Sequence, residues 1–392
     1  MVSMGTVKSG LDVLVHHHRG LLRGRRVALL CHQASVDRHL RHAAGLVRDL
    51  PGVTLTALWA PEHGLAGAAQ DHAAVWSTRE NGTGVPVVSL YGRRLVPDRK
   101  MLDGVDTVVV DLQDVGARYY TFQWTAVLAL TACAAAGIPV VLLDRPNPLG
   151  GVAMEGNLPA SRFLSFVGLW PLPARHGMTI GEVASLVNAR AEIGCDLTVV
   201  PMDGWRRSMA WADTGLPWVS PSPNMPTLDS ALVYPGGCLV EGTNLSEGRG
   251  TTRPFELVGA PFLNGAALAG AMERRRLPGV AFRPAGFIPT FHKWQGRPCG
   301  GVQVHVTDAR RFRPFATYVT LIAEARRLAP RAFAWRRPPY EYERTTLPID
   351  LLGGGDAIRR AIARNTPGPL ERAWRRDVAA FARIRRPHLL YA

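Results

Sequence analysis

The sequence predicts an α/β fold: a Rossmann-like, mostly parallel sheet forms an N-terminal domain, and a smaller α/β C-terminal domain follows, with a cleft between the two. Short β-branched runs alternate with helix-length segments in the first half of the chain. These runs are apolar without interruption, as expected of parallel strands that helices cover on both faces. At 392 residues, the chain also exceeds the size at which a single hydrophobic core usually stops growing.

Five apolar runs that end in polar residues are predicted to be strands of the N-terminal sheet. They are residues 25–33, 53–61, 85–92, 105–115 and 137–148. A helix is predicted over 119–137, because Gly137 is a typical residue at a helix C-terminus. The next helix, over 176–194, begins with the capping-box spacing of Thr179 and Glu182, so Glu182 is assigned a structural role.

A strand over 196–205 leads into a proline-rich, aromatic stretch at 211–230, which is interpreted as an ordered connector because turn-forming residues are dense there. We place the domain boundary inside it, with an N-terminal domain at 1–228 and a C-terminal domain at 229–392. In the second domain, residues 238–240 are predicted to be a strand. Further helices are expected over 265–277, 313–329 and 356–385, and further strands over 280–289 and 299–308.

The charge of the chain bears on its partners. The net charge is +15, but lysine occurs only at Lys8, Lys100 and Lys293, so the positive charge is arginine spread along the chain. Without an RNA-recognition motif, zinc finger or basic helix, we expect a basic solvated surface and no nucleic-acid partner, although such a field favours an anionic substrate. No apolar run reaches membrane-spanning length, so no membrane partner is expected.

Missing motifs bear on cofactors and compartment. No G-x-G-x-x-G follows the first strand and no G-x-x-x-x-G-K-[ST] occurs, so we expect neither a nucleotide nor any other cofactor. The five cysteines lie far apart and fit neither a disulfide framework nor a zinc site. The opening residues lack the features of a secretory signal, which predicts a cytoplasmic protein.

Polar residues follow three of the predicted strands at the point where each strand ends. Glu62 and His63 follow the strand at 53–61. Because ligands of open α/β sheets bind beyond the carboxyl ends of the strands, such residues are candidates for one site. We call this edge of the predicted sheet, where the strands end, the rim. Its other members are Asp111, Gln113, Asp114, Asp144, Arg145 and Asn147.

A second stretch rich in polar side chains lies at 234–261, after the domain boundary. Its glycines permit tight turns and close approach of the backbone to a ligand. A purely connecting loop would not need so many different donors and acceptors. The candidates in this stretch are Glu241, Thr243, Asn244, Glu247 and Arg249.

Together these blocks resemble a known family. They read "PEHG" (61–64), "SLYG" (89–92), "DLQDVGARYYT" (111–121), "LDRPNP" (143–148), "RHGMTIGE" (175–182), "SPNMPT" (222–227) and "EGTNLSEGRGTTRPFE" (241–256). In order and rough spacing they resemble the exo-β-N-acetylmuramidases of the NamZ type, long catalogued as a domain of unknown function. The resemblance runs from residue 27 to the closing "RRPHLLYA", and "CHQASVD" (31–37) departs from the usual pattern.

The resemblance implies a glycosidase that removes N-acetylmuramic acid (MurNAc) from the non-reducing end of peptidoglycan fragments, such as its disaccharide with N-acetylglucosamine, MurNAc-GlcNAc. The expected partner is therefore a peptidoglycan-derived saccharide. It also implies a site in the cleft between the two domains, and the glycosidase needs no metal. The length of the substrate, the stereochemical course and the oligomeric state stay open.

Glycoside hydrolysis usually needs a carboxylic acid that protonates the leaving oxygen and a second carboxylate that activates water or acts as nucleophile. Glu62 is the candidate acid, because it matches "PEHG" and follows an apolar strand, where partial burial raises the pKa of a carboxyl group. Glu241 is the candidate partner from across the cleft. Either could instead be a loop glutamate that bonds to backbone. Substitutes for either role are Asp111, Asp114, Asp144 and Glu247, and a route through the substrate's own acetamido group is also open.

The lactyl carboxylate of muramic acid calls for a planar, bidentate donor. Arg118, Arg145 and Arg249 are the candidates, and each could instead form an inter-domain salt bridge. His63 and His176 are candidates for orienting Glu62 or a sugar hydroxyl, or for structural hydrogen bonds. Candidates for binding sugar hydroxyls, or for turn chemistry, are Asn147, Asn224 and Asn244.

Two rival functions remain. A metallohydrolase is suggested by a set of carboxylates and imidazoles, although no H-E-x-x-H or comparable spacing supports it. The set is Glu62, His63, Asp71, His72, Asp111 and Asp114. A sensor of cell-wall fragments would bind a muropeptide and release nothing, and the intact pair Glu62 and Glu241 argues against it.

Overall fold

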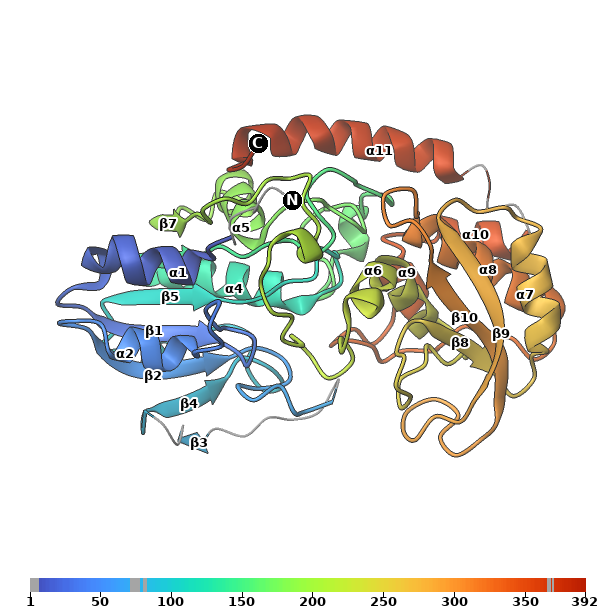
Figure 1. Ribbon diagram of the computed structural model, residues 1–392, viewed down its shortest axis with the longest axis horizontal. Helices are drawn as coiled ribbons and strands as arrows, with labels where there is room; N and C mark the ends of the chain where they lie inside the picture. Colours follow the sequence, from blue (N-terminus) through green and yellow to red (C-terminus); the bar gives the residue numbers. More distant parts are fainter. Residues whose placement is uncertain (1–6, 71–77, 80–82, 365–367, 369) are drawn as a thin grey trace.

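The N-terminal half of the chain is built on a seven-stranded sheet (Figure 1). The computed structural model describes residues 7–70, 78–79, 83–364, 368 and 370–392. The strands are β1 (Arg26–Cys31), β2 (Thr54–Ala60), β3 (Thr78–Arg79), β4 (Pro86–Ser89), β5 (Thr107–Asp111), β6 (Val140–Leu143) and β7 (Leu197–Val200). Their order is β3-β4-β2-β1-β5-β6-β7, and only the β3–β4 pair is antiparallel. The predicted Rossmann-like, mostly parallel sheet is therefore confirmed.

Helices cover both faces of this sheet, which explains why its central strands β1, β5 and β6 are mostly apolar. The helices of this half are α1 (Gly10–Val13), α2 (Ala43–Arg48), α3 (Arg99–Leu102), α4 (Thr121–Ala136) and α5 (Ile180–Arg190). On β1, Ala28 and Leu30 belong to the same buried cluster as Leu130 of α4. Val27 and Leu29 point the other way, into the cluster that contains α1 and α2. Successive residues of a strand alternate between faces, so one strand serves two cores.

Two predicted helix signals are confirmed at α4 and α5. Gly137 ends α4 in the left-handed conformation, with φ of 67°, which a glycine adopts without the steric cost that a side chain adds. Thr179 caps α5, and Glu182 closes the reciprocal capping box. Glu182 also contacts Arg207, so its structural role is confirmed.

The C-terminal half contains a smaller antiparallel sheet with helices packed on it. Its sheet, in the order β8-β10-β9, consists of β8 (Leu257–Ala260), β9 (Val280–Phe287) and β10 (Cys299–Val306). The helices are α6 (Leu228–Gly237), α7 (Gly265–Glu273), α8 (Pro314–Leu328), α9 (Pro348–Leu352), α10 (Ala357–Ala363) and α11 (Leu370–Arg385). An α/β C-terminal domain is thus confirmed as a fold class, whereas the boundary at residue 228 stays a prediction.

One predicted element is wrong. Residues 238–240 are not a strand but part of a 3-10 helix, η5 (Cys238–Gly242), which continues directly from α6. A short buried apolar run has the same composition in a strand and in a buried helix, so periodicity could not separate them. The consequence is local, because Glu241 still lies near the end of the element.

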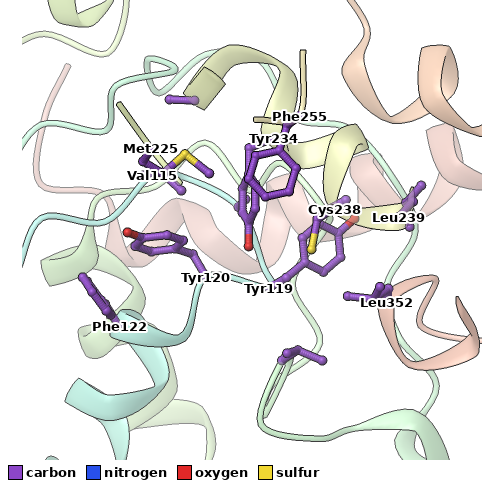
Figure 2. Packing of buried hydrophobic residues seen from close by; sticks show 14 of the residues in the cluster. Val115, Tyr119, Tyr120, Phe122, Met225, Tyr234, Cys238, Leu239, Phe255 and Leu352 are labelled. Atoms are coloured by element: carbon purple, nitrogen blue, oxygen red, sulfur yellow. The ribbon is translucent and has the colours of Figure 1, made fainter. Parts of the chain in front are cut away.

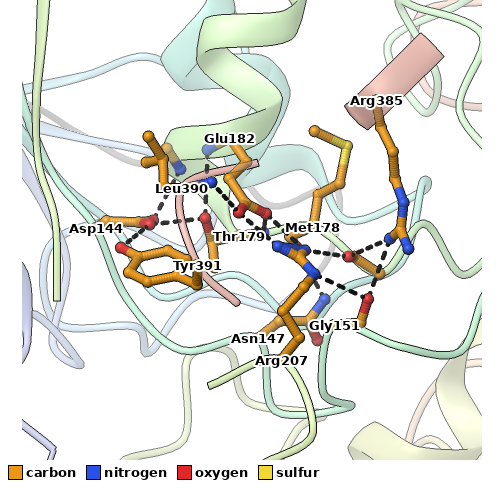
Figure 3. Close-up of polar contacts among 12 residues, drawn as sticks. Asp144, Asn147, Gly151, Met178, Thr179, Glu182, Arg207, Arg385, Leu390 and Tyr391 are labelled. Atoms are coloured by element: carbon orange, nitrogen blue, oxygen red, sulfur yellow. Dashed lines mark hydrogen bonds and ion pairs between the residues drawn. The ribbon is translucent and has the colours of Figure 1, made fainter. Parts of the chain in front are cut away.

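The end of the chain returns to the N-terminal half. Helix α11 runs from the C-terminal sheet back across α5 (Figure 1). Arg385 donates to the carbonyl oxygen of Gly177 at 2.6 Å, and the Tyr391 hydroxyl donates to Asp144 at 2.6 Å (Figure 3). The amide of Leu390 donates to Glu182. The last residues therefore tie the two halves together. Within the described residues, no helix is both long and apolar enough to cross a bilayer.

The buried pair of Glu182 and Arg207 should be important for stability. Arg207 contacts the two carboxylate oxygens at 2.6 and 2.9 Å. Arg207→Met leaves a buried charge without its partner, so we expect the free energy of unfolding in urea to fall by about 3–5 kcal/mol. Lys8→Met removes the exposed pair with Asp203 and should cost less than about 1 kcal/mol. Equal losses in the two variants would contradict this role.

Candidate active site

A pocket lies where the two halves of the chain meet, and both halves contribute its walls. It holds about 490 Å³ of empty space, part of which is open to solvent. Glu62, His63 and Thr121 line it from the N-terminal half, and Glu241 and Arg249 from the C-terminal half. The other lining residues are Tyr119, Tyr120, Val167, Ser222, Asn224, Met225, Tyr234, Phe255, Tyr340 and Glu341.

Glu62 stands in a tight turn immediately after β2. His63 and Gly64 both have left-handed backbones, with φ of 70° and 79°, and the amide of Gly64 donates to the carbonyl oxygen of Pro61. The Thr121 hydroxyl, from the first residue of α4, donates to the Glu62 carboxyl at 2.7 Å. Glu62 is 6% exposed, so the pocket is its route to solvent or substrate.

Glu241 enters the pocket from η5 with both carboxylate oxygens engaged. Arg249 donates to one oxygen at 2.8 Å, and the Tyr340 hydroxyl donates to the other at 2.7 Å. Gly242 follows, and a Cβ at that position would lie 2.7 Å from the backbone of Ile349 in α9. The absence of a side chain there lets η5 pack directly on α9.

A second buried carboxylate, Glu247, contacts the cations that lie around Glu241. Glu247 contacts Lys293 at 2.7 Å and His292 at 3.1 Å, and Arg249 lies 3.4 Å away. Burial alone would raise the pKa of Glu247, but these cations outweigh it and hold the pKa below its ordinary value. Lys293 also donates to the carbonyl oxygens of Val240 and Thr243, on both sides of Glu241.

Tyrosines form much of the pocket's interior (Figure 2). The rings of Tyr120 and Tyr234 meet edge to face at 5.9 Å, and Tyr234 meets Phe255 at 4.8 Å. Burial raises the pKa of both Tyr120 and Tyr234 well above its ordinary value. Their phenols therefore stay protonated at neutral pH and can serve as hydrogen-bond donors or acceptors.

A third carboxyl group, Glu341, lines the pocket beside Tyr91. The Tyr91 hydroxyl donates to Glu341 at 3.2 Å. Burial, followed by interactions with Glu62 and Glu341, raises the pKa of Tyr91 far above its ordinary value. Tyr91, from the N-terminal half, is thus hydrogen-bonded to a carboxyl group of the C-terminal half.

Several predicted site residues lie outside this pocket and have structural partners. Asp111 and Arg145 are buried against each other, with one contact of 2.7 Å. Asp144 accepts from Thr179, Gly181 and Tyr391. Another rim residue, Asn147, donates to the carbonyl oxygen of Met178 and accepts from the Leu149 amide.

Three more predicted residues are also buried. Arg118 is fully buried and donates to the carbonyl oxygens of Asn157, Leu172 and Leu352. His176 lies 3.8 Å from Asp114. Burial lowers the pKa of His176 to about 3 and raises the pKa of Asp114 to about 7, although the Gly116 amide counteracts the latter.

Thr243 and Asn244 line a different and more open hollow, together with His292, Lys293, Trp294 and Arg336. Thr243 accepts from the Leu245 amide, and Asn244 exchanges hydrogen bonds with the segment 332–334. Of the predicted residues, the pocket itself brings together Glu62, His63, Asn224, Glu241 and Arg249.

The rival metal site finds no geometric support in the described part of the chain. Within those residues, no group of three or more histidine, cysteine, aspartate or glutamate side chains could hold a metal ion. Asp71 and His72, two of its predicted ligands, lie outside the described residues.

The sequence reasoning missed Thr121, Tyr340 and Glu341. Thr121 carried a signal, because it ends the block "DLQDVGARYYT" after a rim strand. Tyr340 and Glu341 lie in a loop between α8 and α9, where neither periodicity nor a strand end marks them. The long chain separation from Glu241 and Tyr91 also hid these partners.

Comparisons with known proteins cover almost the whole chain. Residues 27–229 match the family model "Exo-beta-N-acetylmuramidase NamZ, N-terminal", and residues 232–391 match the corresponding C-terminal model. The chain is 43% identical over 386 residues to the peptidoglycan beta-N-acetylmuramidase NamZ of Bacillus subtilis (strain 168), a match that covers 98% of this chain and 91% of that protein.

Two solved structures of DUF1343 family proteins from Bacteroides fragilis NCTC 9343 share this fold. The first has a TM-score of 0.88 at 32% identity, and the match covers 99% of each chain. The second has a TM-score of 0.77 at 26% identity, again over 99% of each chain. The two-part α/β architecture is therefore shared over the full length of these proteins.

The raised pKa of Asp114 predicts how stability varies with pH. In the folded protein the pKa of Asp114 is about 7, whereas an aspartate in the unfolded chain has a pKa near 4. Stability from this group is thus complete below pH 4 and is lost as the pH rises to 7, by at most about 4 kcal/mol. Asp114→Asn should remove this slope from the free energy of unfolding, measured in urea at several pH values. The exposed control Asp196→Asn should retain it, and equal slopes in Asp114→Asn and wild type would contradict the assignment.

Proposed function

The chain belongs to the NamZ family of exo-β-N-acetylmuramidases, and from this premise we propose that it is an exo-acting glycoside hydrolase of peptidoglycan fragments. It releases N-acetylmuramic acid from the non-reducing end of saccharides such as MurNAc-GlcNAc, in cell-wall turnover and recycling. The observation that carries this proposal is the pocket in which Glu62 and Glu241 arrive from the two halves of the chain.

We assign Glu62 as the acid that protonates the leaving oxygen. Its carboxyl group is buried beside the pocket, and the Thr121 hydroxyl fixes its orientation. Glu241 is the second carboxylate, and Arg249 and Tyr340 hold it by both oxygens. Such a pair supplies the two roles that glycoside hydrolysis requires.

Substrate recognition is assigned to the remaining polar groups of the pocket. Among the three predicted arginines, Arg249 lines the pocket, so it is the one proposed to face the lactyl carboxylate. Asn224 and His63 are proposed to contact sugar hydroxyls from the N-terminal side. The tyrosine rings exclude water, which strengthens these polar contacts.

The proposal extends to location and domain organisation. We propose that the protein acts in the cytoplasm on imported fragments, and its detection in culture medium by immunoblot, without cell lysis, would overturn this.

We also propose that residues 1–228 and 229–392 are the two domains, with the second completing the cleft. Limited proteolysis that cuts first near residue 228 is the expected result.

Substrate specificity gives a first activity test. The wild-type protein should release 4-nitrophenol from the β-glycoside of N-acetylmuramic acid and leave the N-acetylglucosamine glycoside intact, because only the former carries the lactyl carboxylate. Absorbance of the released 4-nitrophenol measures both reactions, and EDTA should not change the rate. Failure of the folded protein to cleave either glycoside would remove the proposed function.

Glu62 gives the corresponding test of the acid. Glu62→Gln keeps the size of the side chain but cannot donate an acidic proton, so kcat/KM on MurNAc-GlcNAc should fall by about 10²–10⁴-fold. Glu371 is exposed on α11, and Glu371→Gln is the matched control that should retain full activity. Chromatography of the released sugars measures the rates, and undiminished activity of Glu62→Gln would exclude it as the acid.

A further inference from the structure

A single lysine from the loop between β9 and β10 contacts the backbone on both sides of Glu241. Lys293 donates to the carbonyl oxygens of Val240 and Thr243, at 3.1 and 3.0 Å. Its ammonium group also lies 2.7 Å from the Glu247 carboxylate. An ammonium group has three donors, and these three contacts use all of them.

The residues before and after Lys293 contact the same stretch of chain. His292 lies 3.1 Å from Glu247, and the indole nitrogen of Trp294 donates to the carbonyl oxygen of Asn244 at 2.6 Å. Three consecutive residues of this loop are therefore attached to the segment that begins at η5. The attachment fixes the Lys293 backbone, so that its side chain has a defined direction.

The place of the ammonium group suits the end of a helix. Element η5 continues from α6 and ends at Gly242. The last carbonyl oxygens of a helix carry partial negative charge, and a cation that bonds to them is favoured by the helix dipole. Three acceptors also converge on one nitrogen atom, which fits a compact ammonium better than a planar guanidinium. Lys293 is the only lysine after residue 100 in a chain whose other cations there are arginines.

We propose that Lys293 is a positioning residue for Glu241, which fixes the end of η5 and so keeps the carboxylate at its place in the pocket. The inference rests on the proposed function and adds a residue to it. Arg249 and Tyr340 contact the carboxylate itself, whereas Lys293 contacts the backbone that bears it. Lys293 lines the separate open hollow and not the pocket, so it acts on the reaction through η5.

The first test separates kcat from KM. Lys293→Ala should lower kcat on MurNAc-GlcNAc by about 10–100-fold, because a displacement of about 1 Å in a reacting group can cost a factor of about 10². KM should change by less than about 3-fold, since the contacts with bound substrate stay in place. Chromatography of the released sugars measures the rates. Lys100 is exposed on α3, and Lys100→Ala is the matched control that should keep both parameters.

The open hollow allows a second test, by chemical rescue. The hollow holds about 820 Å³ of empty space, part of it open to solvent, and the Lys293 side chain is 17% exposed. Propylammonium has the atoms that Lys293→Ala lacks, so adding it should restore part of kcat to this variant. The neutral 1-propanol should not, and neither compound should raise kcat of wild type or Lys100→Ala. An unchanged circular dichroism spectrum during rescue would show that the ammonium group restores positioning and not folding.

A double variant tests whether Lys293 acts through Glu241. Glu241→Gln removes the carboxylate that Lys293 is proposed to position, so the addition of Lys293→Ala should lower kcat no further. An additive loss would overturn the inference and assign Lys293 a general structural role. Unchanged kcat in Lys293→Ala, or a loss that propylammonium does not restore, would also overturn it.

The remaining outcomes are kept distinct by a second substitution and by wild type. Should Lys293→Ala fail to fold by circular dichroism, Lys293→Met, which keeps the apolar stem, decides by its kcat and by the double variant with Glu241→Gln. Failure of folded wild type to hydrolyse MurNAc-GlcNAc would remove the proposed function itself. Failure of the inference alone leaves wild type active, so the two are distinguishable.

Discussion

The geometry of the pocket depends on one hydrophobic interface, because its carboxyl groups come from two halves of the chain. Tyr119 and Tyr120, which precede α4, pack against Tyr234 of α6 at ring distances of 6.3 and 5.9 Å (Figure 2). The Tyr119 hydroxyl also donates to the carbonyl oxygen of Pro235. One buried cluster runs from the strands of the first sheet through these rings to the second sheet. Aromatic contacts of this kind add about 0.5–1.5 kcal/mol each beyond area burial, so the two halves have a defined relative position.

Charge compensation within the C-terminal half fixes the orientation of Glu241. Two carboxylates, Glu241 and Glu247, lie against two cations, Arg249 and Lys293. Buried charges persist only when partners satisfy them, so each side chain restrains the others. The arrangement places Glu241 without the backbone strain that the turns at His63 and Glu341 require. A preorganised carboxylate of this kind loses little energy to reorganisation when charge develops on a substrate.

The crevice where a Rossmann sheet would hold a nucleotide is occupied by the chain itself. The strand order reverses between β1 and β5, which is where such ligands bind. His32, after β1, accepts from the Gln113 amide and contacts the carbonyl oxygen of Pro221. Gln33 donates to the carbonyl oxygen of Ser220. The connector that the sequence marks by its prolines therefore covers the crevice, and the pocket forms beside it, between the end of β2 and the start of α4.

The sequence predicts those features that depend on local pattern. Continuous apolar runs predicted the parallel sheet, and Gly137 and Thr179 predicted the end of α4 and the start of α5. The position of Glu62 at a strand end predicted a residue that lines the pocket. Local pattern fails where the outcome depends on a partner distant in the chain. Asp111 and Glu62 both lie at the carboxyl end of a buried strand, Asp111 as the last residue of β5 and Glu62 two residues after β2, yet Arg145 pairs with Asp111 in the core.

The same reasoning explains why Glu341 carries no signal in the sequence. Its backbone is in the left-handed region, and the next residue, Tyr342, packs on Tyr91 and Phe166, which lie far away in the chain. Glu341 lines the pocket, whereas the fold buries Asp111 against Arg145 outside it. That difference between Glu341 and Asp111 is a property of packing, and no spacing of residues within either segment encodes it.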